Sequence, residues 1–411
     1  QDSLHWARNH GFPFAVVHLD CAETPKLVMK RGAAWVWGPV HRLGSGKTRE
    51  EVLARMSLLK RGTPVRLDDL PRARKLLSRS GWFASVGEAQ LFRSSNRNQL
   101  HPAFPIEEQS TNEAEGWFSY QNDGSDSGGS WTGHISLTLD NISGTGRSLE
   151  LLGETSDDTR EASFSYREPY PLGAPLVAQV EAGMWTEDST EEKEWGELGT
   201  TWRLDFEWSA ELSTGISHAR EDDATSDSRW GALAVTRDGR DRQPLPRQGW
   251  LWSLELTGGR RKIQDSTEND TTRNYAKCYT EFGLWLPLHQ RLGWVNQSFA
   301  EALWPHDGGY LSAELLSLGG EILAGYWPGA FKTTAYADWQ SSLRWTWSQT
   351  QALVFVEGAR LLADDAWEWH LSYGLGWEQQ TSGVGLGLRL AWNEDSKPLE
   401  GLLSLALRTK F

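Results

Sequence analysis

The sequence predicts a membrane-spanning antiparallel β-barrel with sixteen strands, preceded by a small α/β domain. Three observations predict this fold. From Trp367 to Trp377 an aromatic residue or leucine stands at every odd position, and a polar residue or glycine at every even one. The 411 residues include 24 Trp. Residues 1–100 contain 17 Lys or Arg and 8 Asp or Glu, a net of +9, whereas the remaining 24 basic and 47 acidic residues give 101–411 a net of −23.

The alternation recurs along the acidic part of the chain, in WLWSLELT (250–257), DWQSSLRWTW (338–347) and LLSLALRTKF (402–411). A period of two places one set of side chains on each face of a strand. In a soluble β-sandwich, the alternative, the apolar face would pack on a second sheet. Tryptophans near strand ends are instead typical of a membrane interface, and Gly, Arg and Glu on the other face are typical of a wet lumen. We therefore favour the barrel.

Sixteen alternating segments fit between Glu113 and Phe411. These 299 residues provide about 19 per strand with its connector, enough for spans of about 9–11 residues. No stretch approaches 18 consecutive apolar residues, which excludes a transmembrane helix. An even number of strands returns both ends of the barrel, residues 113–411, to one side of the membrane.

Residues 33–100 predict the small domain, in the order strand, helix, helix, strand. TREEVLARMSLL predicts the first helix with Thr48 as its N-cap, and LDDLPRARKLLSRSG predicts the second with Gly81 as its stop. Residues 101–112 are predicted to be a linker. The motif GSGKT (44–48) lacks the glycine that a phosphate-binding loop needs five residues before Gly46, where His41 stands. We therefore predict no nucleotide site.

The sequence offers no set of residues for catalysis. Its ten histidines are scattered without metal-ligand spacing, and no Gly-x-Ser-x-Gly motif is present. Cys21 and Cys278 lie in regions of different character, which argues against a disulfide framework or a zinc site. We predict a protein that is not an enzyme, with no catalytic, cofactor-binding or metal residues. A barrel enzyme that uses a serine and a histidine is the remote alternative.

Residues 33–100 resemble the POTRA domain, the periplasmic module that precedes certain outer-membrane barrels. The matching positions are Leu58, Gly62, Pro64, Leu70, Leu76, Leu77, Gly81, Phe83 and Val86. Residues 1–32 resemble the C-terminal part of a preceding, truncated POTRA domain, with a helix, GFPFA and a strand. The resemblance implies that this N-terminal region lies in the periplasm.

Four stretches of the acidic part resemble the BamA-type assembly factors of the bacterial surface antigen superfamily, in the family's order. Residues 140–176 resemble its second to fifth strands. Residues 235–255 resemble its central periplasmic turn, in which Asp238, Arg240, Asp241, Pro246 and Gly249 recur. Residues 315–331 resemble its sixth extracellular loop, which folds back into the lumen, and 355–361 with SYGLGW resemble its thirteenth and fourteenth strands.

The lumen loop motif departs from the family at one position. Its residues are Leu318, Gly319, Gly320, Ala324, Gly325 and Tyr326. The family has arginine in place of Ala324, and that arginine pairs with lumen carboxylates, to which Glu357 corresponds. A buried carboxylate without a partner is costly. We expect water or another arginine, such as Arg360 or Arg344, to compensate, or the loop to be held less firmly.

The resemblance implies a protein of the bacterial outer membrane that inserts other β-barrels into the lipid bilayer. Its partners would be unfolded outer-membrane protein clients, captured by β-augmentation on the POTRA domain, and periplasmic accessory proteins or lipoproteins. No nucleic acid and no cofactor is implied. A lateral seam between the first and last strands would serve as a template edge. The seam residues are Gly116, Trp117, Phe118, Leu405, Leu407 and Phe411.

A different class of function stays open beside insertion. The chain would then be a two-partner-secretion-type or other pore that exports a polypeptide. Accelerated folding of an unrelated barrel would favour insertion, and current through the reconstituted protein would favour transport.

Overall fold

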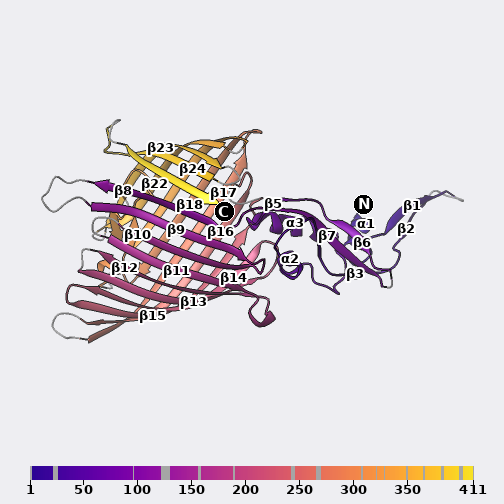
Figure 1. Ribbon diagram of the computed structural model, residues 1–411, viewed down its shortest axis with the longest axis horizontal. Coiled ribbons are helices and arrows are strands. Elements are labelled where there is room, and N and C mark those ends of the chain that lie inside the picture. Colours follow the sequence, from indigo (N-terminus) through magenta and orange to yellow (C-terminus); the bar gives the residue numbers. More distant parts are fainter. Residues whose placement is uncertain are drawn as a thin grey trace. The chain divides into compact units, whose positions relative to one another are not determined.

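The computed structural model describes residues 2–21, 26–95, 97–121, 130–155, 159–187, 190–241, 246–264, 270–306, 309–320, 322–327, 329–348, 350–363, 366–380, 384–397 and 401–410. Contacts between residues divide the chain into two compact units (Figure 1). Unit 1 consists mainly of residues 1–109, and unit 2 consists mainly of the residues that follow.

Unit 1 is built on a mixed five-stranded sheet whose central strand is β7 (Gln99–Glu108). Two strands pair with β7 in parallel and two in antiparallel orientation. These are β3 (Val36–Trp37) and β4 (His41–Leu43), then β5 (Phe83–Val86) and β6 (Gln90–Arg93). The two predicted helices are present as α2 (Glu50–Met56) and α3 (Asp69–Arg79). Each helix buries apolar side chains, namely Leu53 of α2 and Ala73 and Leu77 of α3.

The linker predicted at 101–112 is wrong for its first eight residues, which belong to β7. Pro102 and Pro105 weaken the strand signal because proline has no N–H to donate to a neighbouring strand. The side chains of Leu100 and Phe104 are nevertheless fully buried. Packing in the core therefore outweighs the local signal, and only residues 109–112 remain as a connection.

The boundary predicted at residue 32 does not separate two compact units. The predicted helix and strand are present as α1 (Asp2–Arg8) and β1 (Val16–Asp20). β1 pairs with β2 (Lys26–Lys30), a strand that the sequence does not predict. All three elements belong to unit 1 together with the sheet on β7.

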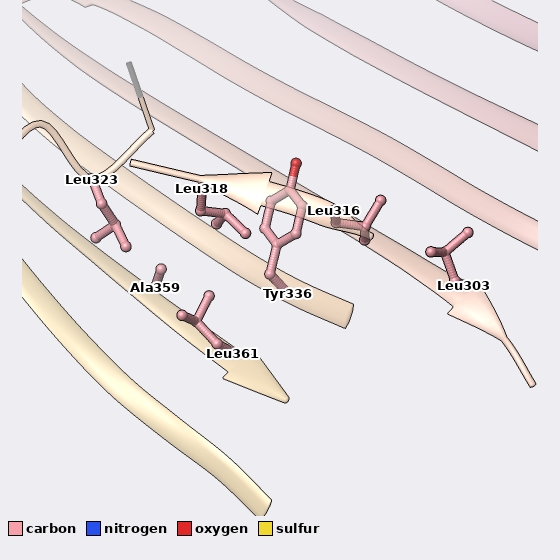
Figure 2. Close-up of a cluster of buried hydrophobic side chains, with 7 residues drawn as sticks. All are labelled: Leu303, Leu316, Leu318, Leu323, Tyr336, Ala359 and Leu361. Atoms are coloured by element: carbon pink, nitrogen blue, oxygen red, sulfur yellow. The ribbon is translucent and has the colours of Figure 1, made fainter. Parts of the chain in front are cut away.

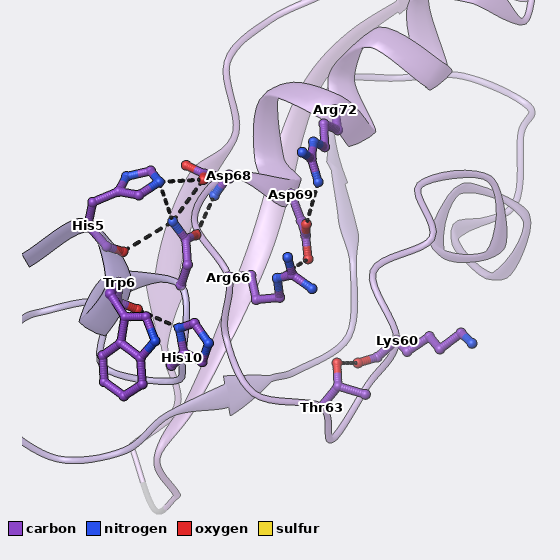
Figure 3. A network of polar contacts seen from close by, with 10 residues as sticks. His5, Trp6, His10, Lys60, Thr63, Arg66, Asp68, Asp69 and Arg72 are labelled. Atoms are coloured by element: carbon purple, nitrogen blue, oxygen red, sulfur yellow. Dashed lines mark hydrogen bonds and ion pairs between the residues drawn. The ribbon is translucent and has the colours of Figure 1, made fainter. Parts of the chain in front are cut away.

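A polar network joins the segment after α1 to the start of α3 (Figure 3). The side-chain amide of Asn9 donates to the Asp68 carboxylate at 2.8 Å and accepts from the Asp68 N–H at 3.0 Å. His5 Nε2 lies 3.0 Å from the same carboxylate. The N–H of Trp35 also donates to the carbonyl of Gly11 at 2.7 Å. These bonds explain why residues 1–32 do not form a unit of their own.

The GSGKT loop holds a carboxylate of its own unit. The N–H groups of Lys47 and Thr48 donate to Glu108 at 2.7 and 2.8 Å, and Arg42 donates to it at 3.0 Å. A Cβ on Gly46 would lie 2.3 Å from the Glu108 carboxyl group, so a larger residue there would displace this carboxylate from its donors. The N-cap of α2 is Arg49, without a side-chain hydrogen bond, so the predicted Thr48 cap is wrong. The backbone N–H of Thr48 is instead bound to Glu108.

Unit 2 is an antiparallel sheet of sixteen strands, closed into a barrel (Figure 1). The strands follow one another around the ring in chain order. They are β8 (Glu113–Gln121), β9 (Ser130–Ile142), β10 (Arg147–Thr155), β11 (Thr159–Pro169), β12 (Val177–Glu187), β13 (Glu191–Arg203), β14 (Trp208–Glu221), β15 (Ala224–Asp238), β16 (Gly249–Gln264), β17 (Asp270–Pro287), β18 (Leu292–Trp304), β21 (Ala335–Trp347), β22 (Thr350–Ala363), β23 (Ala366–Gln380), β24 (Val384–Asn393) and β25 (Leu402–Lys410). The predicted antiparallel sheet of sixteen strands is confirmed.

The two faces of the barrel strands differ in polarity, as the alternation predicts. In β23, the odd-numbered side chains from Trp367 to Leu375 are 43–63% exposed, whereas Ser372 is fully buried. Large apolar side chains are also exposed on β13, β14 and β16, namely Leu198, Leu212, Ile216 and Leu256. The outer face is therefore apolar, and the polar side chains turn toward the interior.

Unit 1 provides a test of the Glu108 contacts. Burial acts to raise the pKa of Glu108, but the hydrogen bonds from Thr48 and Lys47 and the charge of Arg42 lower the pKa below its ordinary value. Such a carboxylate stabilises the folded state above its unfolded-state pKa, and this contribution is lost as the pH falls through the folded-state pKa. We expect Glu108→Gln to cost about 1–3 kcal/mol at neutral pH.

Amide hydrogen exchange of residues 44–56 in the whole protein measures this effect. The Glu108→Gln variant should exchange faster at neutral pH and should lose less protection than the parent on acidification. An identical loss of protection in both proteins would contradict this account.

Candidate functional site

The contact that closes the barrel is the shortest among the described strand pairings of the sheet. β25 and β8 share three residue pairs, Glu113–Lys410, Ala114–Thr409 and Glu115–Arg408. By comparison, β25 shares eight pairs with β24, and β8 shares nine with β9. The stretches 116–121 of β8 and 402–407 of β25 are therefore not paired with each other. Both are edges within an otherwise continuous ring.

The predicted seam residues fall on these two edges. Gly116, Trp117 and Phe118 lie on β8 just beyond the three pairs, and Leu405 and Leu407 lie on the facing stretch of β25. Phe411 lies outside the described residues, as do the side chains of the other apolar seam residues. A Cβ on Gly116 would lie 3.1 Å from the His134 carbonyl oxygen, so glycine lets β8 run close to β9.

The chain between β18 and β21, residues 305–334, is called the lumen loop here. It contains the short 3₁₀ helix η2 (Ser312–Glu314) and the strand pair β19 (Leu316–Leu318) and β20 (Phe331–Thr333). Leu318 and Leu323 of the loop are 1% and 0% exposed. Figure 2 shows them packed with side chains from β18, β21 and β22, namely Leu303, Tyr336, Ala359 and Leu361, and with Leu316. The wall residues of this cluster belong to the inward-facing sets of their strands.

Three glycines shape the tip of the lumen loop. Gly319 has φ +121° and Gly320 has φ +80°, both in the region that favours glycine. A Cβ on Gly325 would lie 2.5 Å from the Trp392 carbonyl carbon, and the carbonyl of Gly325 accepts a hydrogen bond from the Asn393 side chain at 3.1 Å. The tip therefore lies directly against the backbone of β24.

Glu357 and Ala324 meet in the structure, through the backbone of the loop. The N–H of Ala324 donates to Glu357 Oε2 at 2.9 Å, and Ser372 Oγ donates to the same oxygen at 3.2 Å. Glu357 is 1% exposed. The Ala324 methyl group packs with Leu353 and with two further residues, Phe355 and Ala391. A backbone N–H thus supplies the donor to Glu357 that the sequence analysis expects from water or an arginine.

Neither arginine considered as a substitute contacts Glu357 among the described residues. The Arg360 guanidinium lies outside, 5.4 and 5.7 Å from the ring centres of Trp367 and Trp369. Arg344 points inward, but its Nε donates to Ser342 Oγ at 3.1 Å. The expectation that one of these arginines compensates is wrong, because Arg360 faces outward and Arg344 bonds elsewhere.

Asp338 is a second buried carboxylate beside Glu357. It is 4% exposed, stands on β21 and interacts electrostatically with Glu357 on β22. In the described part of the chain, no cation forms an ion pair with either group. Two carboxyl groups that share a buried environment repel one another strongly whenever both are ionised. This arrangement is a local cost that the surrounding packing must offset.

The lumen loop is held near both of its ends by a set of polar contacts that the sequence analysis misses. Glu314 forms an ion pair with Arg261 of β16, and Lys332 lies 2.9 and 3.4 Å from Glu187 and Glu191. The alternation of β16 predicts that the Arg261 side chain points inward. Its partner is 53 residues away, and no spacing rule connects the two.

The residues of the predicted central turn, between β15 and β16, lie together in the structure. Arg240 makes two hydrogen bonds to Asp238, at 3.1 and 3.0 Å. Asp241 accepts from the N–H groups of residues 247 and 248 at 3.0 and 3.2 Å, after Pro246. Gly249 has φ +118°, and a Cβ there would lie 2.5 Å from the Gly239 carbonyl oxygen. The turn is therefore a well-bonded structural element.

Two further features of the described ranges concern membrane-spanning helices and metal binding. None of the helices found there has the length and hydrophobicity that crossing a bilayer takes. Nowhere in the same ranges do three or more His, Cys, Asp or Glu side chains gather as metal ligands would.

No family model and no curated protein sequence matches this chain. Solved structures share its fold. CdiB from Escherichia coli is 12% identical, with a TM-score of 0.64 over 100% of this chain and 83% of that chain. CdiB from Acinetobacter baumannii is 11% identical, with a TM-score of 0.62 over 98% of this chain and 79% of that chain. BamA from Haemophilus ducreyi lacking POTRA domains 1–3 is 16% identical, with a TM-score of 0.54 over 99% of this chain and 92% of that chain.

The buried carboxylates yield a prediction of opposite sign for two substitutions on the same wall. We expect Asp338→Asn to stabilise the barrel by roughly 1 kcal/mol or more, because it removes a buried ionisable group whose ionisation beside Glu357 is costly. We expect Glu301→Gln to destabilise it, because Glu301 is paired with Lys277 at 2.6 Å and accepts from the Tyr336 hydroxyl at 3.1 Å. The temperature at which the folded barrel loses its compact migration in SDS gels measures both. A lower temperature for Asp338→Asn would contradict the repulsion argument.

Proposed function

We propose that this protein inserts β-barrel proteins into the bacterial outer membrane, with the seam between β8 and β25 as its working edge. The observation that carries the proposal is that these strands share three residue pairs among the described residues. Beyond those pairs, residues 116–121 and 402–407 carry backbone N–H and C=O groups that do not bond across the seam. Unpaired groups of this kind are costly in lipid, so an incoming strand that pairs with them is stabilised.

A membrane location is supported by the outer face of the barrel. Exposed leucine, isoleucine and tryptophan side chains there have no partner sheet in the described part of the chain, and they would be unfavourable in water over so large a surface. A lipid bilayer matches this face, with tryptophans at the headgroup level and leucines in the hydrocarbon. The fold shared with BamA and CdiB structures agrees with this location.

Unit 1 is proposed to be a POTRA domain in the periplasm. Its order of strands, two helices and further strands, together with the matching residues of the sequence, supports this assignment. Its role would be to receive unfolded outer-membrane protein clients by β-augmentation along a sheet edge, and to bind periplasmic accessory proteins or lipoproteins. The driving force would be client folding itself, so the protein would need neither enzymatic activity nor a cofactor.

Export of a polypeptide is the second candidate function, and one observation favours it. The lumen loop lies inside the barrel, where it could control a path for an extended chain. Two measurements on purified protein in vesicles separate the functions. A faster folding rate of an unrelated barrel supports insertion, and voltage-driven current together with passage of a polypeptide supports export.

The seam proposal predicts the effect of a cross-link between Gly116→Cys and Leu407→Cys, in a background in which Cys21 and Cys278 are serine. These positions continue the register beyond the Glu115–Arg408 pair. We expect the oxidised protein to lose most of its ability to accelerate client folding, and reduction to restore it.

A matched control keeps the cysteine on β25 and places its partner on β24, away from the seam. Leu386 and Leu407 face each other in that ladder, so the cross-link Leu386→Cys with Leu407→Cys leaves the seam free. The control should retain the parent rate in both redox states. If the oxidised seam variant also retains it, the seam is not the working edge.

The membrane location predicts how β23 tolerates charge. Trp369 and Leu371 both face outward, at 63% and 45% exposure, and Leu371 lies nearer the middle of the strand. An arginine on the lipid face costs about 2–4 kcal/mol at the midplane and about 0–1 kcal/mol near the interfaces. Leu371→Arg should therefore reduce the folded yield in vesicles more than Trp369→Arg. Equal yields for both variants would argue against a lipid-facing surface.

A further inference from the structure

The lumen loop is tied to two opposite walls of the barrel. The N–H of Ser312 donates to Glu221 at the end of β14 at 2.8 Å, whereas Gly325 accepts from Asn393 at the end of β24 at 3.1 Å. Counted around the ring from β8, β14 is the seventh strand and β24 the fifteenth, which are eight strands apart in a ring of sixteen. The loop therefore crosses the lumen and does not follow one wall.

The end of the loop near β14, β15 and β16 is organised around the Glu314 carboxylate. It accepts hydrogen bonds from Arg261 on β16, from Ser226 Oγ on β15 at 2.7 Å and from the Leu311 N–H at 3.0 Å. The Arg261 and Glu314 side chains are 2% and 9% exposed. The Arg261 guanidinium carbon also lies 4.0 Å from the centre of the Tyr310 ring. Two barrel strands and the loop thus converge on one buried ion pair.

The other contacts of the loop with this wall are weaker. Lys332 and its partners Glu187 and Glu191 are 20–30% exposed, so water screens their attraction. Lys193 donates to the Ala313 carbonyl at 2.9 Å, and its charge also interacts with Glu314, although no ion pair joins the two among the described residues. Separating Arg261 from Glu314 leaves the buried Arg261 charge without its carboxylate partner, which is costly. The ion pair is therefore the contact whose loss most favours release of the loop.

We propose that the Arg261–Glu314 ion pair pins the lumen loop across the barrel and keeps the lumen closed, so that passage through the lumen requires the pair to separate. The inference rests on the proposed function only in that the barrel spans a membrane. It assigns to these two residues the control of the path that an exported polypeptide would need. It makes no use of the seam.

The test uses the full chain in planar lipid bilayers, with single-channel conductance as the readout. We expect Arg261→Glu and Glu314→Arg each to raise the frequency of open-channel events about tenfold, and the double variant, which restores an ion pair with the charges exchanged, to return most of the way to the parent. Glu314→Gln keeps the size and hydrogen-bonding capacity of the side chain, and it should raise the frequency by a smaller factor. Chymotrypsin, whose aromatic and leucine sites in the loop none of these substitutions changes, should cleave the loop increasingly in the same order.

The matched control is the neighbouring ion pair of Lys262 and Asp270, which is 2.8 Å long and about half exposed on both sides. Lys262→Glu reverses a charge one residue from Arg261 and should leave conductance and cleavage at the parent level. Folding of each variant is checked by heat-modifiable migration in SDS gels. If a charge reversal prevents folding, Glu314→Gln decides, and parent-like conductance of that variant overturns the proposal.

The outcome is separate from that of the proposed function. If the parent protein fails to accelerate client folding but its channel opens on charge reversal, the pin proposal stands and the insertion proposal fails. If the parent protein accelerates client folding but no variant changes the conductance, the insertion proposal stands and the pin proposal fails. Opening of the Lys262→Glu control to the same extent as Arg261→Glu would also overturn the pin, because the effect would then be one of net charge.

Discussion

Every backbone N–H and C=O group in the wall of a barrel has to find its partner within the sheet, and β8 and β25 meet this requirement for only three residue pairs. The rest of unit 2 can be understood from this constraint. Long ladders join the other strands, such as the fourteen residue pairs between β15 and β16, whereas the closing contact is short. The apolar outer face fixes where the ring is stable, and the buried loop fills part of its interior.

Much of unit 2 can be predicted from the sequence because a period of two is a strong signal over many strands. The outward set of β23 and the inward position of Glu357 follow from it directly. Contacts between distant residues do not. The Arg261–Glu314 pair depends on how the lumen loop packs, and the donor to Glu357 is a backbone N–H that no side-chain pattern reveals. In unit 1, the prolines of β7 conceal a central strand, because local propensity is weaker than burial in a core.

The two ends of the lumen loop are held by different kinds of contact. At its tip, the carboxylate of Glu357 is served by neutral donors, Ala324 N–H and Ser372 Oγ. At its start, the carboxylate of Glu314 is served by a guanidinium. The electrostatic hold on the loop therefore lies at the β15–β16 wall, and the hold at β22 depends on close packing and hydrogen bonds. A comparison that considers only the tip would conclude that the loop is loosely held.

The contacts of the lumen loop also constrain the order in which the molecule can be assembled. Ser226 and Glu314 are 88 positions apart in the chain, Asn393 and Gly325 are 68 apart, and Lys332 and Glu187 are 145 apart. Contacts over such separations form only after the intervening chain has been ordered, because each closes a long segment at an entropic cost. The loop can take its place only once strands on both sides exist to receive it. The interior of this barrel is thus completed late. In a chain interrupted before β24, the loop would lack the strand that receives its tip.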